Sequence, residues 1–237
     1  MGNEDKAFKI NDGVLEKYRG SETSFVIPEG VSVISAFAFK GCTNLVSVTI
    51  PSGVTGINAS AFEDCRSLVS VTIPGSVTEI GKKAFGECTS LTSVHIPGSV
   101  TEIGEEAFSE CRSLASVTIP KGVTCIRSST FRNCKALTSV TIPESVEEIE
   151  WMAFSNCTSL REIRYEGTKG RWLFELLGFR DTPEGVAVYC SDGDACPIPV
   201  DATEIVIPGD VKKIGADALR SRTSLTSVVI PAGVTVL

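Results

Sequence analysis

The sequence predicts an elongated α/β repeat protein, a solenoid in which short stretches of chain stack as successive coils around one core. The dipeptide Ile-Pro recurs every 23 residues from Ile27-Pro28 to Ile142-Pro143, and again at Ile207-Pro208 and Ile230-Pro231. An Ala-Phe pair and a cysteine recur in the same frame. This period is too short for paired helices, and it fits one strand, one return segment and one short helical or irregular turn per coil.

The 237 residues correspond to about ten coils, which we expect to form one continuous solenoid. Residues 1–20 are expected to form a capping hairpin, because an Asn-Asp-Gly turn separates two apolar stretches. Residues 21–160 hold the regular repeats. Residues 161–200 are interpreted as two degenerate coils with a short helix, and residues 201–237 hold the last repeats.

The short helix is predicted within the degenerate coils. Thr168 is placed to cap its first turn, with Trp172, Leu173 and Leu176 on one face.

Each coil follows the pattern A-F-x-x-C-x-x-L-x-S-V-x-I-P-x-x-V-x-x-I, as in AFGECTSLTSVHIPGSVTEI. Strand alternation directs Leu91, Val94 and Ile96 into the coil. The intervening Ser93 and His95 point outward. Proline cannot donate a hydrogen bond to a ladder and therefore ends each strand. The phenylalanines of the Ala-Phe pairs should stack as an internal spine, because aromatic side chains bury the most apolar area.

The spacing of the cysteines indicates their structural role. Neighbours in a column of one thiol per coil lie about 4.8 Å apart along parallel directions, a geometry that closes neither a disulfide nor a metal site. We therefore expect a ladder of buried thiols, no metal site and no cofactor. The ladder consists of Cys42, Cys65, Cys88, Cys111, Cys134 and Cys157.

Three cysteines lie outside this column. Cys125 stands where other coils have glutamate, and we expect it to be the most readily modified thiol. Cys190 and Cys196 lie six residues apart, and either remain reduced or pair in an oxidising compartment.

Composition and charge exclude several functions. A net charge of −7 and a pI near 4.9 argue against nucleic acid and anionic membranes, because both require a basic face. Neither a long apolar run nor a signal peptide is visible, so we expect no membrane insertion. One histidine, His95, without a recurring acid or nucleophile beside it argues against an enzyme, and we assign no catalytic residue. The glutamate-rich segments are interpreted as a solvated acidic face.

The repeat unit strongly resembles the leucine-rich repeats of BspA-like bacterial surface proteins. The resemblance covers six coils from about residue 22 to 160 and one more from 201 to 237. It implies a right-handed leucine-rich-repeat solenoid with a concave parallel β-sheet, and a cell-surface or secreted location. It also implies adhesion or other protein recognition, and it carries no catalytic residues.

We therefore expect a non-enzymatic recognition or adhesion module that binds a protein, such as a host matrix protein, or a glycan. The outward columns of the sheet are small and uncharged, whereas binding energy concentrates in residues such as Arg, Tyr and Trp. Arg, Tyr and Trp appear where the sequence of the repeat becomes irregular. The candidate partner-binding residues are Ser93, His95, Thr118, Ser139, Thr141, Arg161, Glu162, Arg164 and Tyr165.

Alternatives remain open at this point. Trp151 and Trp172 are interpreted as core residues that fill imperfect coils. The alternative is that they belong to the binding surface. The protein as a whole is alternatively a structural spacer or surface-layer element without a ligand, or an ice-binding protein that uses its paired Ser and Thr columns. The sequence makes no prediction of oligomeric state.

Overall fold

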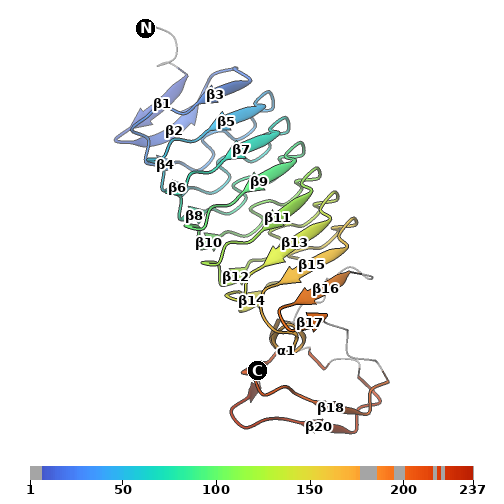
Figure 1. Ribbon diagram of the computed structural model, residues 1–237. Coiled ribbons are helices and arrows are strands. Elements are labelled where there is room, and N and C mark those ends of the chain that lie inside the picture. Colours follow the sequence, from blue (N-terminus) through green and yellow to red (C-terminus); the bar gives the residue numbers. More distant parts are fainter. Residues whose placement is uncertain (1–6, 177–185, 195–200, 216–217, 220–221, 237) are drawn as a thin grey trace.

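The computed structural model describes residues 7–176, 186–194, 201–215, 218–219 and 222–236. The chain forms a β-solenoid of about eight turns with parallel sheets (Figure 1). Each turn contributes one short strand to a column that we call the front sheet. Its strands are β3 (Ser24–Val26), β5 (Ser47–Thr49), β7 (Ser70–Thr72), β9 (Ser93–His95), β11 (Ser116–Thr118), β13 (Ser139–Ile142), β15 (Glu162–Tyr165) and β16 (Ala187–Cys190).

A second column of two-residue strands lies where each coil returns after its proline. These return strands also pair in parallel, with isoleucine aligned on isoleucine in successive coils. They are β4 (Val33–Ile34), β6 (Gly56–Ile57), β8 (Glu79–Ile80), β10 (Glu102–Ile103), β12 (Cys125–Ile126) and β14 (Glu148–Ile149).

An antiparallel hairpin stands at the N-terminal end of the stack. It consists of β1 (Phe8–Asn11) and β2 (Val14–Tyr18), and β2 continues the ladder by pairing in parallel with β4. Its turn uses Asp12 and Gly13 at positive φ (47° and 75°), the conformation that Asp and Gly tolerate best. The hairpin therefore covers the open edge of the return strands.

The aromatic spine predicted from the Ala-Phe pairs is confirmed. Six phenylalanines are fully buried, and their rings stack along the solenoid with centroids 4.8–5.6 Å apart and planes within 10° of parallel. Backbone bonds at the same corner tie neighbouring coils, as where the Phe85 amide donates to the Ala107 carbonyl at 2.8 Å. The six are Phe39, Phe62, Phe85, Phe108, Phe131 and Phe154.

Two turns flank each Ala-Phe pair, and non-glycine residues make nearly all of them. In one coil Lys83 and Glu87 have φ of 55° and 60°, and the equivalent positions of the other coils have similar values. This left-handed conformation costs each residue about 1–3 kcal/mol unless its surroundings enforce it. Contacts between the stacked coils must therefore hold these turns in place.

The prediction of an α/β repeat is wrong for the coils, because they close through these irregular turns instead of helices. The described part of the chain has helix only at α1 (Lys169–Arg171) and the π-helical turn η2 (Trp172–Leu176) that follows it. The predicted cap is confirmed, since Thr168 Oγ1 accepts a hydrogen bond from the Arg171 amide at 3.3 Å. Trp172 and Leu176 are buried as predicted.

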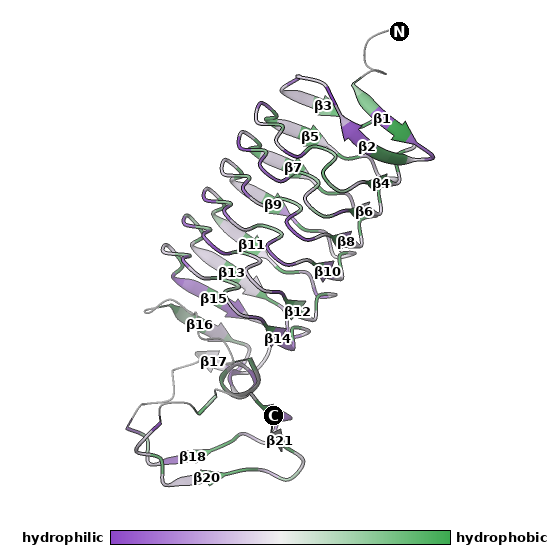
Figure 2. Cartoon of the chain, turned by 180° about the vertical axis from the view of Figure 1, so that it is seen from behind, coloured by the Kyte–Doolittle hydropathy of each residue, from purple (hydrophilic) through white to green (hydrophobic). Residues whose placement is uncertain are grey.

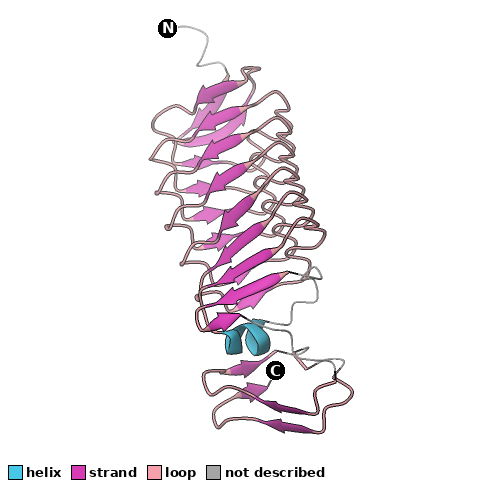
Figure 3. Cartoon of the chain, turned by 45° about the vertical axis from the view of Figure 1, so that its right-hand side comes forward, coloured by secondary structure: helices cyan, strands magenta, loops and turns pink. Residues whose placement is uncertain are grey.

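The prediction of about ten stacked coils is also corrected. The strand β17 (Gly193–Asp194) pairs antiparallel with β16 and ends the parallel ladder. Beyond it, separate two-stranded sheets surround a second core that includes Ile205, Ile207 and Val211, and the helix lies between this unit and the main stack (Figure 3). The strands of this unit are β18 (Glu204–Val206), β19 (Lys213–Ile214), β20 (Ser227–Val229) and β21 (Thr235–Val236).

Replacing Phe85 by Ala is expected to lower the free energy of unfolding by about 3–5 kcal/mol, because the cavity interrupts the stack on both sides. Urea unfolding followed by circular dichroism measures the loss. Phe37→Ala is the matched control, because this ring is 50% exposed and lies outside the spine, and it should lower stability by less than half as much as Phe85→Ala. Equal losses in the two variants would contradict the role of the spine.

Candidate functional site

The outward face of the front sheet carries two columns of side chains in register. The central residue of each strand, usually valine, points toward the core, and the residues on either side of it face outward. One column, the serine column, holds Ser24, Ser47, Ser70, Ser93, Ser116, Ser139, Glu162 and Ala187. The other, the threonine column, holds Val26, Thr49, Thr72, His95, Thr118, Thr141, Arg164 and Tyr189.

The five candidate residues on the regular strands lie on this face. Ser93, His95 and Thr118 are exposed, and Ser139 and Thr141 are half-buried. Register places His95 beside the threonine of the preceding coil. These strands therefore offer a smooth, mostly uncharged surface with small hydroxyl groups.

The face becomes charged at β15, which is coloured hydrophilic whereas the preceding strand β13 is pale (Figure 2). Glu162 aligns with Ser139, and Arg164 aligns with Thr141. The Arg164 side chain forms an ion pair with Glu162, and both groups retain contact with solvent. Arg161 precedes the strand and donates from Nη1 to the Leu160 carbonyl at 2.8 Å. One guanidinium group and one carboxylate therefore lie together on β15, and the Arg161 guanidinium is held by carbonyls of the loop that precedes the strand.

The interpretation of Tyr165 as a partner-binding residue is wrong. The side chain is only 2% exposed, and its ring packs 5.6 Å from that of Trp172. Tyr165 occupies the inward position that isoleucine has in the other coils, so the larger side chain fills the core above the helix.

The interpretation of the two tryptophans as core residues holds for one of them. Trp172 is 3% exposed, whereas Trp151 is 65% exposed. Trp151 lies in the turn before an Ala-Phe pair and not on the front sheet, so it does not plug a coil and does not join the charged end.

Tyr189 belongs to the candidate surface, although it is not among the candidate partner-binding residues chosen from the sequence. It lies on β16 in register with Arg164 and is 44% exposed. The two side chains border a shallow hollow of about 370 Å³, whose wall also includes Glu162 and Ser191. The available signal was the apolar alternation of the segment GVAVYC, which makes Tyr189 an outward residue.

The column cysteines lie inside the core and not on the outward face of the front sheet. The thiol of each column cysteine after Cys42 donates to the carbonyl of the phenylalanine in the preceding coil, as where Cys111 Sγ lies 3.2 Å from the Phe85 oxygen. The same carbonyl accepts the amide of Cys88 at 3.3 Å. Cys42, in the first coil of the column, is only half-buried. The same thiol contact recurs at Cys65, Cys88, Cys134 and Cys157, at 3.1–3.2 Å.

Burial controls the chemistry of these thiols. It raises the pKa of Cys65 and of Cys157 to about 12, and that of Cys88 and Cys111 well above the ordinary value of 9.0. The neutral thiol is therefore the form present in the folded protein, and it acts as a hydrogen-bond donor.

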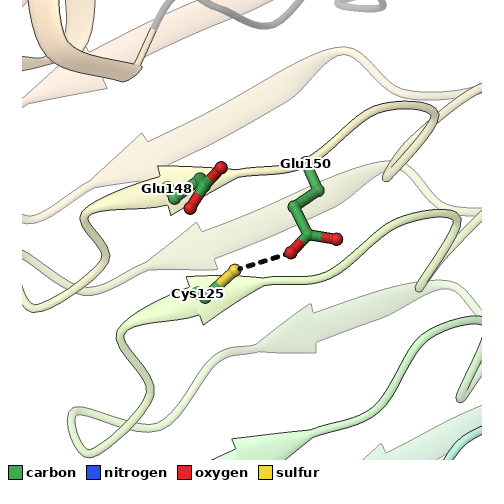
Figure 4. A group of neighbouring side chains, drawn as sticks. All are labelled: Cys125, Glu148 and Glu150. Carbon is green, nitrogen blue, oxygen red and sulfur yellow. Dashed lines mark hydrogen bonds between the residues drawn. The ribbon is translucent and has the colours of Figure 1, made fainter. Parts of the chain in front are cut away.

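Cys125 is less accessible than its sequence position suggested. It is half-buried on β12, and its Sγ lies 3.5 Å from Oε1 of Glu150 (Figure 4). Burial, with the charges of Glu150 and Glu148, raises the pKa of the thiol to about 12. This disfavours the reactive thiolate. Pairing of Cys190 with Cys196 stays a prediction, because Cys196 lies outside the described residues.

Short parallel strands with one buried leucine, valine and isoleucine set per coil, and with bends in place of helices, define a leucine-rich-repeat solenoid. The chain belongs to the family described as the BspA type leucine-rich repeat region. That family's model matches residues 9–136, 78–171 and 200–237. No curated protein matches the sequence.

Solved structures of bacterial proteins share the fold. A leucine-rich repeat protein of T. pallidum is 35% identical over 67% of this chain and 79% of its own, with a TM-score of 0.65. A leucine-rich cell surface protein of Faecalibacterium prausnitzii is 27% identical over 97% of this chain and 73% of its own, with a TM-score of 0.58. A leucine-rich repeat protein of Eubacterium ventriosum, 22% identical over 96% of this chain and 58% of its own, has a TM-score of 0.51. Within the described residues, no helix is long and apolar enough to cross a membrane.

The buried column thiols are expected to resist iodoacetamide in the folded protein even at pH 9.0, where half of an ordinary cysteine is thiolate. Mass spectrometry of the peptides, before and after unfolding in urea, measures the modification at each site. We expect Cys88 and Cys111 to react only after unfolding. Modification of either one in the folded protein would show that the column is open to solvent.

Proposed function

We propose that this protein is a non-enzymatic recognition module that binds a protein or glycan partner through the outward face of the front sheet. This face corresponds to the concave sheet that the family resemblance implies. The register of Arg164 with Tyr189, beside Arg161 and Glu162, carries the proposal. These four residues form the charged end of the face and are its proposed binding centre.

The interior supports the proposal because it stabilises the coils without the outward columns. The phenylalanine spine and the thiol contacts lie wholly inside, so the outward positions carry no packing requirement. The same column accordingly holds Thr72, His95, Arg164 and Tyr189 in different coils. A rigid scaffold with freely variable outward positions is the arrangement that repeat proteins use for binding surfaces.

The residue types at the charged end also support the proposed binding function. Arginine and tyrosine are the side chains that most often dominate binding energy. The ion pair between Arg164 and Glu162 is exposed, so exchanging it for a partner's carboxylate or hydroxyl costs at most about 1 kcal/mol. Tyr189 adds an exposed ring against which an apolar side chain or a sugar face packs.

The location of the protein follows from its relatives as part of the same proposal. The F. prausnitzii protein, which aligns with nearly the whole of this chain, is a leucine-rich cell surface protein. We place this chain at the cell surface or outside the cell, where host matrix proteins and glycans are the available partners.

The double variant Arg161→Ala/Arg164→Ala is expected to lose binding. Tyr189→Ala is expected to weaken binding at least about tenfold, because it removes a contact that contributes strongly to affinity. The assay measures binding of the intact chain to immobilised fibronectin, laminin and collagen and to a glycan array. Binding on the protein arm alone or the glycan arm alone identifies the class of partner.

Thr49→Ala provides the matched control, because this residue lies at the far end of the same column. Its affinity should equal that of the unmodified chain. Unchanged affinity of the double variant would refute the charged end as the binding centre. Absence of binding to every protein and glycan would contradict recognition and favour a structural spacer.

A further inference from the structure

Two adjacent coils bring three metal-ligating side chains together on the return strands. Cys125 on β12 pairs in register with Glu148 on β14, and Glu150 follows two residues later, on the same face as Glu148. One donor atom from each lies within 4.8 Å of the other two (Figure 4). Within the described residues this is the one such group of three.

The cluster is held by the strands beneath it. The residues that follow the two ligands in their strands, Ile126 and Ile149, are buried at 2% and 6% exposure and anchor the strands to the core. The Ser128 amide donates to Oε2 of Glu150 at 2.8 Å, which leaves Oε1 turned toward Cys125. Two of the three side chains are therefore already oriented before any ion arrives.

The neighbouring coils show that this arrangement is not a product of the repeat. Glu79 and Glu102 occupy the same column as Cys125 and Glu148, but neither coil contributes a thiol. Glycines 81 and 104 stand at the position of Glu150. Among the described coils, a carboxylate pair with a thiol exists only where Cys125 meets the next coil.

The donor set selects a class of ion. A thiolate sulfur with two carboxylate oxygens suits zinc and similar thiophilic divalent cations, whereas calcium and magnesium require more oxygen ligands. Zinc is commonly four-coordinate, so three protein ligands leave one position for water. We propose that Cys125, Glu148 and Glu150 form a binding site for a divalent cation of the zinc class.

Binding requires one proton transfer and one rearrangement. The Cys125 thiol gives its proton to the solvent, and the sulfur lone pair forms the bond to the metal. Arg127 lies 3.7 Å from Glu150 and 3.1 Å from Glu102, so it keeps its shorter ion pair when the cation takes over Glu150. The negative charges of Glu148 and Glu150 attract the cation.

Titration of the intact, reduced chain with cadmium chloride tests the site, because cadmium bound to a thiolate has an ultraviolet charge-transfer band. We expect one equivalent to give the band, zinc to displace it and calcium to leave it unchanged. Cys125→Ser should abolish the band. Glu148→Gln, a change at an exposed residue, should weaken cadmium binding at least about tenfold.

Two control variants separate this site from the rest of the chain. Glu79→Gln removes a carboxylate of the same column away from the cluster, and Cys190→Ser/Cys196→Ser removes the thiols of the degenerate region. Both should bind cadmium as the unmodified chain does. The proposal is overturned if the band persists in Cys125→Ser, if it disappears in Cys190→Ser/Cys196→Ser, or if Glu148→Gln binds with unchanged affinity.

Discussion

Inside each coil a phenylalanine carbonyl is turned into the core, and the coil that follows supplies a donor for it. The Phe85 oxygen accepts the Cys88 amide from its own coil and the Cys111 thiol from the next. The amide of the same coil satisfies one lone pair of this buried carbonyl, and the thiol of the next coil adds a second hydrogen bond that links each coil to its successor. The phenylalanine rings stack over the same contact. One phenylalanine and one cysteine per coil therefore link the successive coils between Phe39 and Cys157.

This contact explains two other features of the molecule. The stacking that it accompanies also holds the left-handed turns at Lys83 and Glu87, whose amides donate to carbonyls of the next coil. It also places the stabilising interactions inside the coil, so that the outward columns vary without loss of fold. The charged end at Arg164 and Tyr189 and the cluster at Cys125 are two places where different outward residues meet across neighbouring coils.

Much of the fold was predictable because one position recurs in many coils. The phenylalanine spine, the strand alternation and the cap at Thr168 all followed from the 23-residue frame and local chemistry. Tyr165 was misjudged because its residue type was given more weight than its inward position. Cys125 and Glu148 lie one period apart, so the 23-residue frame predicts that they pair across neighbouring coils. The antiparallel strand β17, which ends the ladder, depends on a tertiary contact that no periodicity encodes.

Native-state hydrogen exchange of the intact chain tests most directly whether the phenylalanine and cysteine contact governs stability. The amides of Phe85 and Phe108, in the middle of the spine, are predicted to exchange slowest, because their exposure requires opening of stacked coils on both sides. The strands β18 and β20 surround a separate core without stacked phenylalanines, and are predicted to exchange much faster. Equal protection of β18, β20 and the central coils would contradict the account.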